Sequence, residues 1–153
     1  YSFVTKVYHF TLGNSGSICL PVTKELQDKD LADERGIVAG WGLVNSTTKS
    51  NIRLKVELPI FSKTTCNIYY KRSSRSKGIK RMTNTFCAGE VGHDSCKGDS
   101  GGPMMIESWY DNTYKFVQYG IMSYGPQQCS SEKPGVYTDV RKFVKWILDT
   151  IEP

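Results

Sequence analysis

The chain has 153 residues, of which 39% are hydrophobic and 23% charged, and a formal net charge of +5. This length and composition suit one globular domain and exclude a disordered chain. No apolar run approaches the ~18 residues that a membrane-spanning helix needs. The sequence begins at Tyr1 with no signal-like segment before the globular pattern, so we interpret it as a fragment or a processed piece.

Short extended runs separated by Gly, Pro, Asn and Ser dominate the chain. They carry β-branched and aromatic residues, and several alternate apolar with polar positions, as half-buried strands do. The predicted strands cover residues 35–41, 53–60, 103–107, 115–123 and 135–140. Turn-like stretches lie at residues 45–50, 73–78 and 111–113. Regularly spaced short strands of this kind predict an all-β sandwich or barrel.

One amphipathic helix is predicted at the end of the chain, over residues 140–151. Its apolar residues recur at steps of three and four. They are Val140, Phe143, Val144, Ile147, Leu148 and Ile151. Either Thr138 or Asp139 could cap its start. The pattern is typical of a terminal helix packed on a β-barrel.

The sharpest chemical signal is the hexapeptide GDSGGP at residues 98–103. A serine becomes a useful nucleophile only when a base takes its proton and donors stabilise the oxyanion formed by its attack. The glycines on both sides of Ser100 permit a tight turn, which brings backbone N–H groups close to a substrate. A glycine-rich turn between two strands is the alternative. The full hexapeptide, with Cys96 just before it, favours the nucleophile.

The chain resembles the C-terminal half of a chymotrypsin-fold, trypsin-like serine protease, and is most similar to the secreted clip-domain proteases of invertebrates. The motifs, in order, are ICLP at 18–21, AGWG at 39–42, CAG at 87–89, DSCKGDSGGP at 94–103, SYG at 123–125 and PGVYTDV at 134–140. The resemblance implies an antiparallel β-barrel, the second barrel of that fold, with a C-terminal helix. It covers residues 17–153 as an incomplete protease domain, whereas residues 1–16 match poorly.

The resemblance also implies roles for single residues. Ser100 is the expected nucleophile, and the N–H groups of Gly98 and Ser100 form the expected oxyanion hole. Asp99 resembles the acid that pairs with a new N-terminal ammonium after zymogen cleavage. The implied substrate-specificity residues are Asp94, Ser123, Tyr124, Gly125 and Gly135. A carboxylate at the end of an apolar slot would favour Arg or Lys; the alternative for Asp94 is a turn aspartate.

A general base and an orienting acid are missing from the sequence pattern. His93 stands next to Asp94 and is misplaced as the base, and the surroundings of His9 do not match those of the family's base. By register, the orienting aspartate would precede Tyr1. We therefore expect a trypsin-like endopeptidase of a secreted cascade, present as a fragment that is inactive alone. The alternative is a non-catalytic homologue or truncated product that acts as a protein-binding module.

The five cysteines leave one without an internal partner. The resemblance pairs Cys66 with Cys87 and Cys96 with Cys129, and leaves Cys19 for a partner in an N-terminal pro-region or clip domain. A free buried thiol is the alternative for Cys19. Persistent disulfides imply a secreted, extracellular protein.

The remaining sequence signals concern the surface. Asn45 begins a glycosylation sequon. Six cations gather between Lys71 and Arg81 and account for the whole net positive charge, so a generally basic nucleic-acid binder is not expected. This run is either a solvated surface loop or an exosite for an acidic partner. A third interpretation of the whole chain, a basic polyanion-binding protein, depends on this loop alone. No metal-ligand spacing is present, so we expect no metal or cofactor. We also expect no membrane partner. The resemblance implies a protein substrate with Arg or Lys at the cleavage site.

Overall fold

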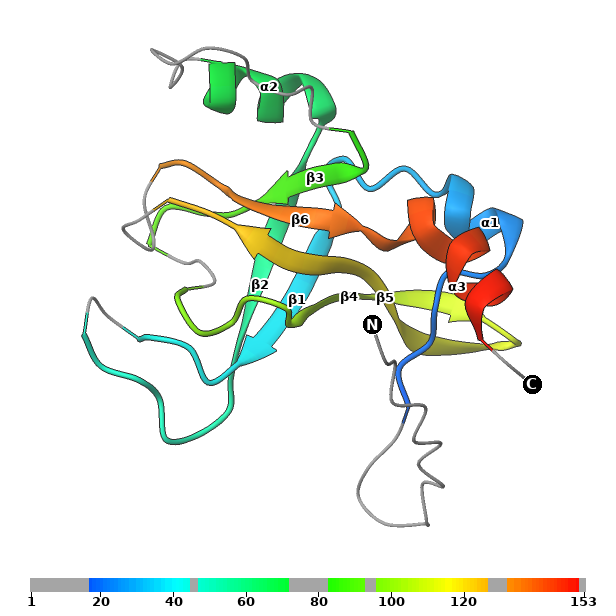
Figure 1. Ribbon diagram of the computed structural model, residues 1–153, viewed down its shortest axis with the longest axis horizontal. Helices are drawn as coiled ribbons and strands as arrows, with labels where there is room; N and C mark the ends of the chain where they lie inside the picture. Colours follow the sequence, from blue (N-terminus) through cyan, green and yellow to red (C-terminus); the bar gives the residue numbers. More distant parts are fainter. Residues whose placement is uncertain (1–16, 45–46, 72–82, 93–95, 127–131, 152–153) are drawn as a thin grey trace.

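The structure is a computed structural model that describes residues 17–44, 47–71, 83–92, 96–126 and 132–151. Its strands form a closed antiparallel barrel in the order β1-β2-β3-β6-β5-β4, with β4 pairing back to β1 (Figure 1). The strands are β1 (Arg35–Gly40), β2 (Leu54–Phe61), β3 (Thr85–Ala88), β4 (Pro103–Tyr110), β5 (Thr113–Tyr124) and β6 (Gly135–Asp139). The predicted all-β barrel is confirmed.

The barrel interior is filled by side chains that alternate along the strands. Leu58 and Ile60 of β2, Val117 and Tyr119 of β5 and Tyr137 of β6 are at most 1% exposed. Burying one such aliphatic side chain contributes about 1.5–3 kcal/mol. The period-two pattern that predicted the strands therefore also fixes which side chains enter the core.

The β4 and β5 strands form the longest hairpin, and both run further than the sequence pattern predicted. Their turn consists of Asp111 and Asn112, with φ of +53° and +58°. Two left-handed residues suit the right-handed twist of a hairpin, and Asp and Asn tolerate this conformation. Beyond the turn, Trp109 lies opposite Tyr114 in the strand register.

In the described ranges three α-helices lie outside the barrel, and two of them were not predicted. The helix α1 (Lys24–Asp28) has five residues, and α2 (Lys63–Lys71) has nine. The predicted terminal helix is present as a 3-10 turn, η1 (Val140–Phe143), followed by α3 (Val144–Thr150). Asp139 caps its start by accepting a hydrogen bond from the backbone N–H of Arg141 at 3.1 Å.

Helices α1 and α3 lie beside each other at one end of the barrel. Helix α2 lies next to β3, away from α1 and α3 (Figure 1). None of the helices in the described ranges has the length and apolarity that a bilayer span requires.

Candidate active site

The loop that holds Ser100 is fixed by backbone hydrogen bonds at both ends. Within it, Asp99 N donates to the Cys96 carbonyl at 3.0 Å, and Gly102 N donates to the Asp99 carbonyl at 2.9 Å. Two further bonds of 2.9 Å, from Gly101 N to Met122 O and from Met122 N to Gly102 O, tie the loop to the end of β5. These bonds therefore hold the loop against the end of β5.

Two glycines of this loop adopt backbone conformations that other residues rarely adopt. Gly98 has φ +103° and Gly101 has φ +84°. A Cβ on Gly98 would also lie 3.1 Å from the Cα of Gly42. Between these glycines Ser100 is exposed, and the N–H groups of Gly98 and Ser100 donate to no other described residue. Oxyanion stabilisation requires N–H donors without a protein acceptor, so the expected roles of Ser100 and of these two N–H groups stay predictions with which the described part of the loop is compatible.

The Asp99 side chain turns away from Ser100 and into the backbone of the loop after β1. Its Oδ1 accepts a hydrogen bond from Gly42 N at 2.8 Å, and its Oδ2 accepts one from Cys96 N at 3.1 Å. A Cβ on Gly40 would overlap Oδ1, and a Cβ on Gly42 would lie 2.5 Å from Cγ. The two glycines of AGWG thus leave the space in which the carboxylate lies, which the sequence motif alone did not reveal.

The residues expected to shape a specificity pocket lie at adjoining strand ends. Ser123 and Tyr124 end β5, Gly125 follows, and Gly135 begins β6. A Cβ on Gly125 would be 3.6 Å from the Cα of Gly135, so the two glycines face each other. Asp94, the expected acid of the pocket, lies outside the described residues.

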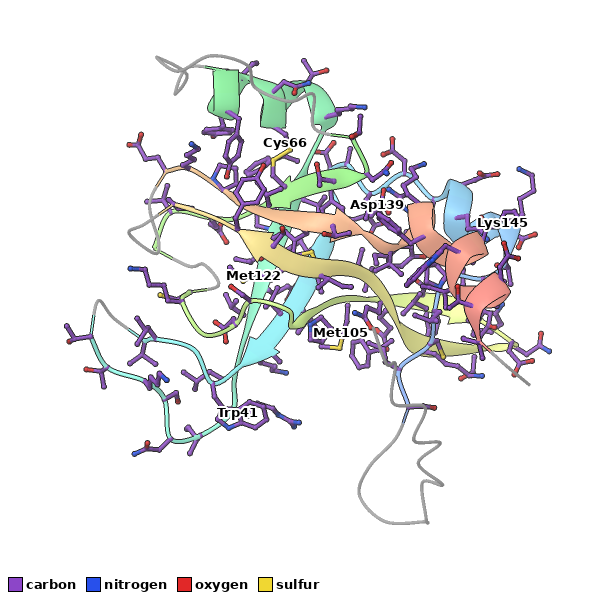
Figure 2. All side chains as sticks on the ribbon, in the orientation of Figure 1. Trp41, Cys66, Met105, Met122, Asp139 and Lys145 are labelled. Atoms are coloured by element: carbon purple, nitrogen blue, oxygen red, sulfur yellow. A yellow bond between two sulfur atoms is a disulfide. The ribbon has the colours of Figure 1, made fainter. Side chains whose placement is uncertain are left out.

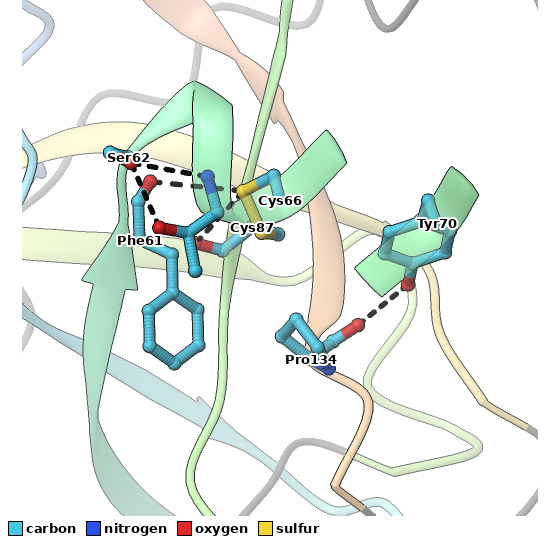
Figure 3. The surroundings of a disulfide bond; sticks show 7 residues. Phe61, Ser62, Cys66, Tyr70, Cys87 and Pro134 are labelled. Carbon is cyan, nitrogen blue, oxygen red and sulfur yellow. Dashed lines mark hydrogen bonds between the residues drawn. A yellow bond between two sulfur atoms is a disulfide. The ribbon is translucent and has the colours of Figure 1, made fainter. Parts of the chain in front are cut away.

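Helix α2 packs against these strand ends, a contact that the sequence did not predict. The hydroxyl of Tyr70 donates to the carbonyl of Pro134 at 2.6 Å, directly before Gly135 (Figure 3). The edge of the Tyr70 ring meets the Tyr124 ring at 6.0 Å between centroids, and Lys133 Nζ lies 4.1 Å from the Tyr70 centroid. No sequence motif marks Tyr70, because its contact depends on a helix whose pattern is not clearly amphipathic.

The cysteines follow the expected scheme as far as they are described. Cys66 and Cys87 form a disulfide with Cα atoms 5.9 Å apart, which anchors α2 to β3 (Figure 3). Cys96 is disulfide-bonded, but its expected partner, Cys129, lies outside the described residues. Cys19 has a free thiol and is half-buried.

Several further expectations fall outside the described residues and stay predictions. They concern Asn45, His9, His93 and the basic run after Lys71, which ends α2. Over the ranges that the structure describes, no group of three or more His, Cys, Asp and Glu residues is arranged to hold a metal ion.

Comparison with known proteins agrees with this fold and loop. The Trypsin family model matches residues 13–147, and the chain belongs to that family. It is 41% identical over 138 residues to the CLIP domain-containing serine protease HP8 of Bombyx mori, covering 88% of this chain and 36% of the relative.

The chain likewise covers only part of the length of two other relatives. Melanization protease 1 of Drosophila melanogaster is 37% identical over 136 residues, covering 88% of this chain and 33% of the relative. The Phenoloxidase-activating enzyme of Bombyx mori is 42% identical over 123 residues, covering 76% of this chain and 27% of the relative. The chain thus spans about a third of the length of the relatives it matches.

Proposed function

We propose that this chain is the nucleophile-bearing part of a trypsin-like serine endopeptidase that cleaves after Arg or Lys in a secreted cascade. The supporting observation is the geometry of the 96–103 loop, in which Asp99 is held by Gly42 and Cys96, while the N–H groups of Gly98 and Ser100 donate to no acceptor in the described part of the chain. The relatives' printed names, which include a melanization protease and a phenoloxidase-activating enzyme, favour a protein substrate.

In this mechanism the Ser100 Oγ attacks the carbonyl carbon of the scissile bond. The oxyanion that forms accepts hydrogen bonds from the N–H groups of Gly98 and Ser100, and the amine leaves to give an acyl-enzyme that water hydrolyses. The hydroxyl proton must pass to a base from outside the described residues. The isolated 153-residue chain should therefore be inactive, and the complete protein active.

Asp99 is the proposed activation switch. Its carboxylate accepts two backbone N–H groups and remains only partly buried. A newly formed N-terminal ammonium near it would add an ion pair to the same carboxylate and fix the loop around Ser100. Specificity for Arg or Lys would come from Asp94, with Gly125 and Gly135 leaving room for a long side chain.

The test compares four samples, the longer protein, its Ser100→Ala and Ser17→Ala variants and the 153-residue chain, with one Lys ester and one Phe ester as substrates. After activation cleavage, the longer protein should hydrolyse the Lys ester faster than the Phe ester. Ser100→Ala should abolish this rate, and the 153-residue chain should react no faster than buffer. Ser17→Ala, an exposed serine away from the loop, is the matched control and should keep the rate. A Ser100-independent rate in the longer protein would sink the proposal.

A second candidate is a non-catalytic binding module. It is favoured because none of the described residues is a histidine that could act as the base for Ser100. The sequence preceding residue 1 discriminates the two. A histidine and an aspartate in register support the enzyme, and their absence supports the module.

A further inference from the structure

The end of β5 offers a free backbone edge next to the loop that holds Ser100. Strand β5 pairs with β4 only as far as Ile121, opposite Pro103, whereas its pairing with β6 continues to Tyr124. On the β4 side, Ser123 and Tyr124 therefore have no strand partner in the described part of the chain. An extended peptide can add to such an edge, where its backbone gives affinity and the neighbouring side chains give specificity. A peptide held there runs beside Tyr124, which is 49% exposed.

A lysine is held beside the aromatic side chains at this edge. Lys133 Nζ lies 4.1 Å from the centroid of the Tyr70 ring, which is a cation–π distance. The Tyr70 ring in turn meets the Tyr124 ring edge to face. We call Lys133, Tyr70 and Tyr124 together the edge cluster. It places a positive charge at the border of the surface along which an added peptide would run.

The ammonium of Lys133 is held in place at both ends of its side chain. Pro134 follows Lys133 and restricts its backbone to extended conformations, and the carbonyl of Pro134 accepts the Tyr70 hydroxyl at 2.6 Å (Figure 3). The cation–π contact holds the other end. A lysine side chain is usually costly to order because it has many rotamers. An ammonium that is already held loses less entropy when it binds a carboxylate.

We propose that Lys133 makes this site select peptides that carry Asp or Glu shortly before the cleaved Arg or Lys, at the residue whose side chain lies over Tyr124. The inference rests on the proposed function, because it names the substrates of that same site. The carboxylate of the bound peptide forms an ion pair with the ammonium of Lys133, which adds electrostatic complementarity to the backbone contacts of the edge. Lys133 is therefore a specificity residue and takes no part in the reaction itself.

The selectivity is modest, because the edge cluster is partly exposed to solvent. An ion pair at such a position typically changes an equilibrium constant by about threefold to fivefold. Added salt should reduce the selectivity, since screening weakens an ion pair that faces solvent. An apolar contact with Tyr124 alone would not weaken in this way, so the salt dependence distinguishes the charge of Lys133 from the aromatic surface beside it.

Another exposed lysine near Ser100, Lys97, provides the matched control. The carbonyl of Lys97 accepts a hydrogen bond from Leu43 N at 2.9 Å, so Lys97 lies beside the loop after β1 and not at the end of β5. If a general positive charge around Ser100 selected acidic peptides, Lys97 and Lys133 would contribute alike. If the edge cluster selects them, only Lys133 contributes.

Cleavage kinetics of the longer protein, after activation cleavage, test the proposal. Fluorogenic peptides ending in Arg carry Glu, Gln or Lys at each of the three preceding positions in turn. At one position kcat/KM should be about threefold to fivefold higher for Glu than for Gln, and lower for Lys. Lys133→Met should remove this preference, Lys133→Arg should retain it, and Lys133→Glu should invert it, whereas Lys97→Met should leave it intact. No preference for Glu at any position, or its equal loss in Lys97→Met and Lys133→Met, would overturn the proposal.

A binding measurement separates this inference from the proposed function. If the longer protein does not hydrolyse the peptides, the same peptides without the leaving group are titrated into it. The Glu peptide should bind about threefold to fivefold more tightly than the Gln peptide; this result would refute the enzyme and keep the selectivity, whereas equal binding or no binding would overturn the selectivity. Hydrolysis without a Glu preference refutes the selectivity and keeps the enzyme. Urea midpoints check that each variant is folded, and the comparison of Lys133→Arg with Lys133→Glu remains if Lys133→Met is not.

Discussion

The Asp99 carboxylate organises the loop around Ser100, and it depends on two glycines that are distant in sequence. Both partners were visible in the sequence as separate motifs, GDSGG and AGWG. Their contact was not visible, because it arises when β1 and β4 pair in antiparallel fashion and bring the loop after β1 close to the loop before β4. Both motifs could be recognised in the sequence. That the glycines of AGWG make room for the Asp99 carboxylate could be seen only once the strands were paired in three dimensions.

Gly40→Ala should destabilise the protein because its Cβ overlaps the Asp99 Oδ1. Overpacking of this kind costs about 1–3 kcal/mol. Removing the carboxylate removes the overlap, so Gly40→Ala should cost much less in an Asp99→Ala background. Urea unfolding of the two single variants and the double variant measures the coupling. Strictly additive free energies of unfolding would show that the glycine does not serve Asp99.

Helix α2 and strand β6 form one unit at the scale of elements. The disulfide from Cys66 fixes the start of α2 to β3, and the Tyr70 hydroxyl fixes its end to Pro134. The strands with clear alternation, β2 and β5, were predicted close to their bounds. The four-residue β3 and the polar α2 were missed, because β3 is too short to show a period and α2 depends on its disulfide and tertiary contacts.

Tyr70→Phe should destabilise this unit by about 1 kcal/mol, since the carbonyl of the buried Pro134 loses its hydrogen-bond donor. Tyr69→Phe is the matched control, because Tyr69 lies on the same helix and contacts Phe61 through its ring at 5.8 Å. The urea midpoint and amide hydrogen exchange at Gly135 and Val136 measure the effect. Equal shifts in the two variants would mean that the Tyr70 hydroxyl contributes nothing specific.

The described part of the molecule has a well-filled barrel and large apolar side chains on its exterior (Figure 2). Thirteen large hydrophobic residues are more than a third exposed in the described part of the chain, among them Trp41, Trp109, Trp146 and Leu148. A barrel with a complete core does not need these side chains for its own folding. Their exposure follows if the barrel is one part of a larger assembly, which agrees with its coverage of about a third of its relatives.

The isolated chain should therefore self-associate in proportion to its concentration. Trp109, Tyr114 and Phe116 on the β4–β5 hairpin are 59%, 65% and 47% exposed, and burying them against another copy removes apolar surface from water. Replacing Trp109 and Phe116 together by Ser should shift the chain toward monomer, because both side chains are exposed and their loss removes no core contact. Trp146→Ser on α3 is the control and should shift it less. Analytical ultracentrifugation over a concentration series measures the association. A chain that stays monomeric throughout, or that responds equally to both changes, would show that copies do not associate through the β4–β5 hairpin.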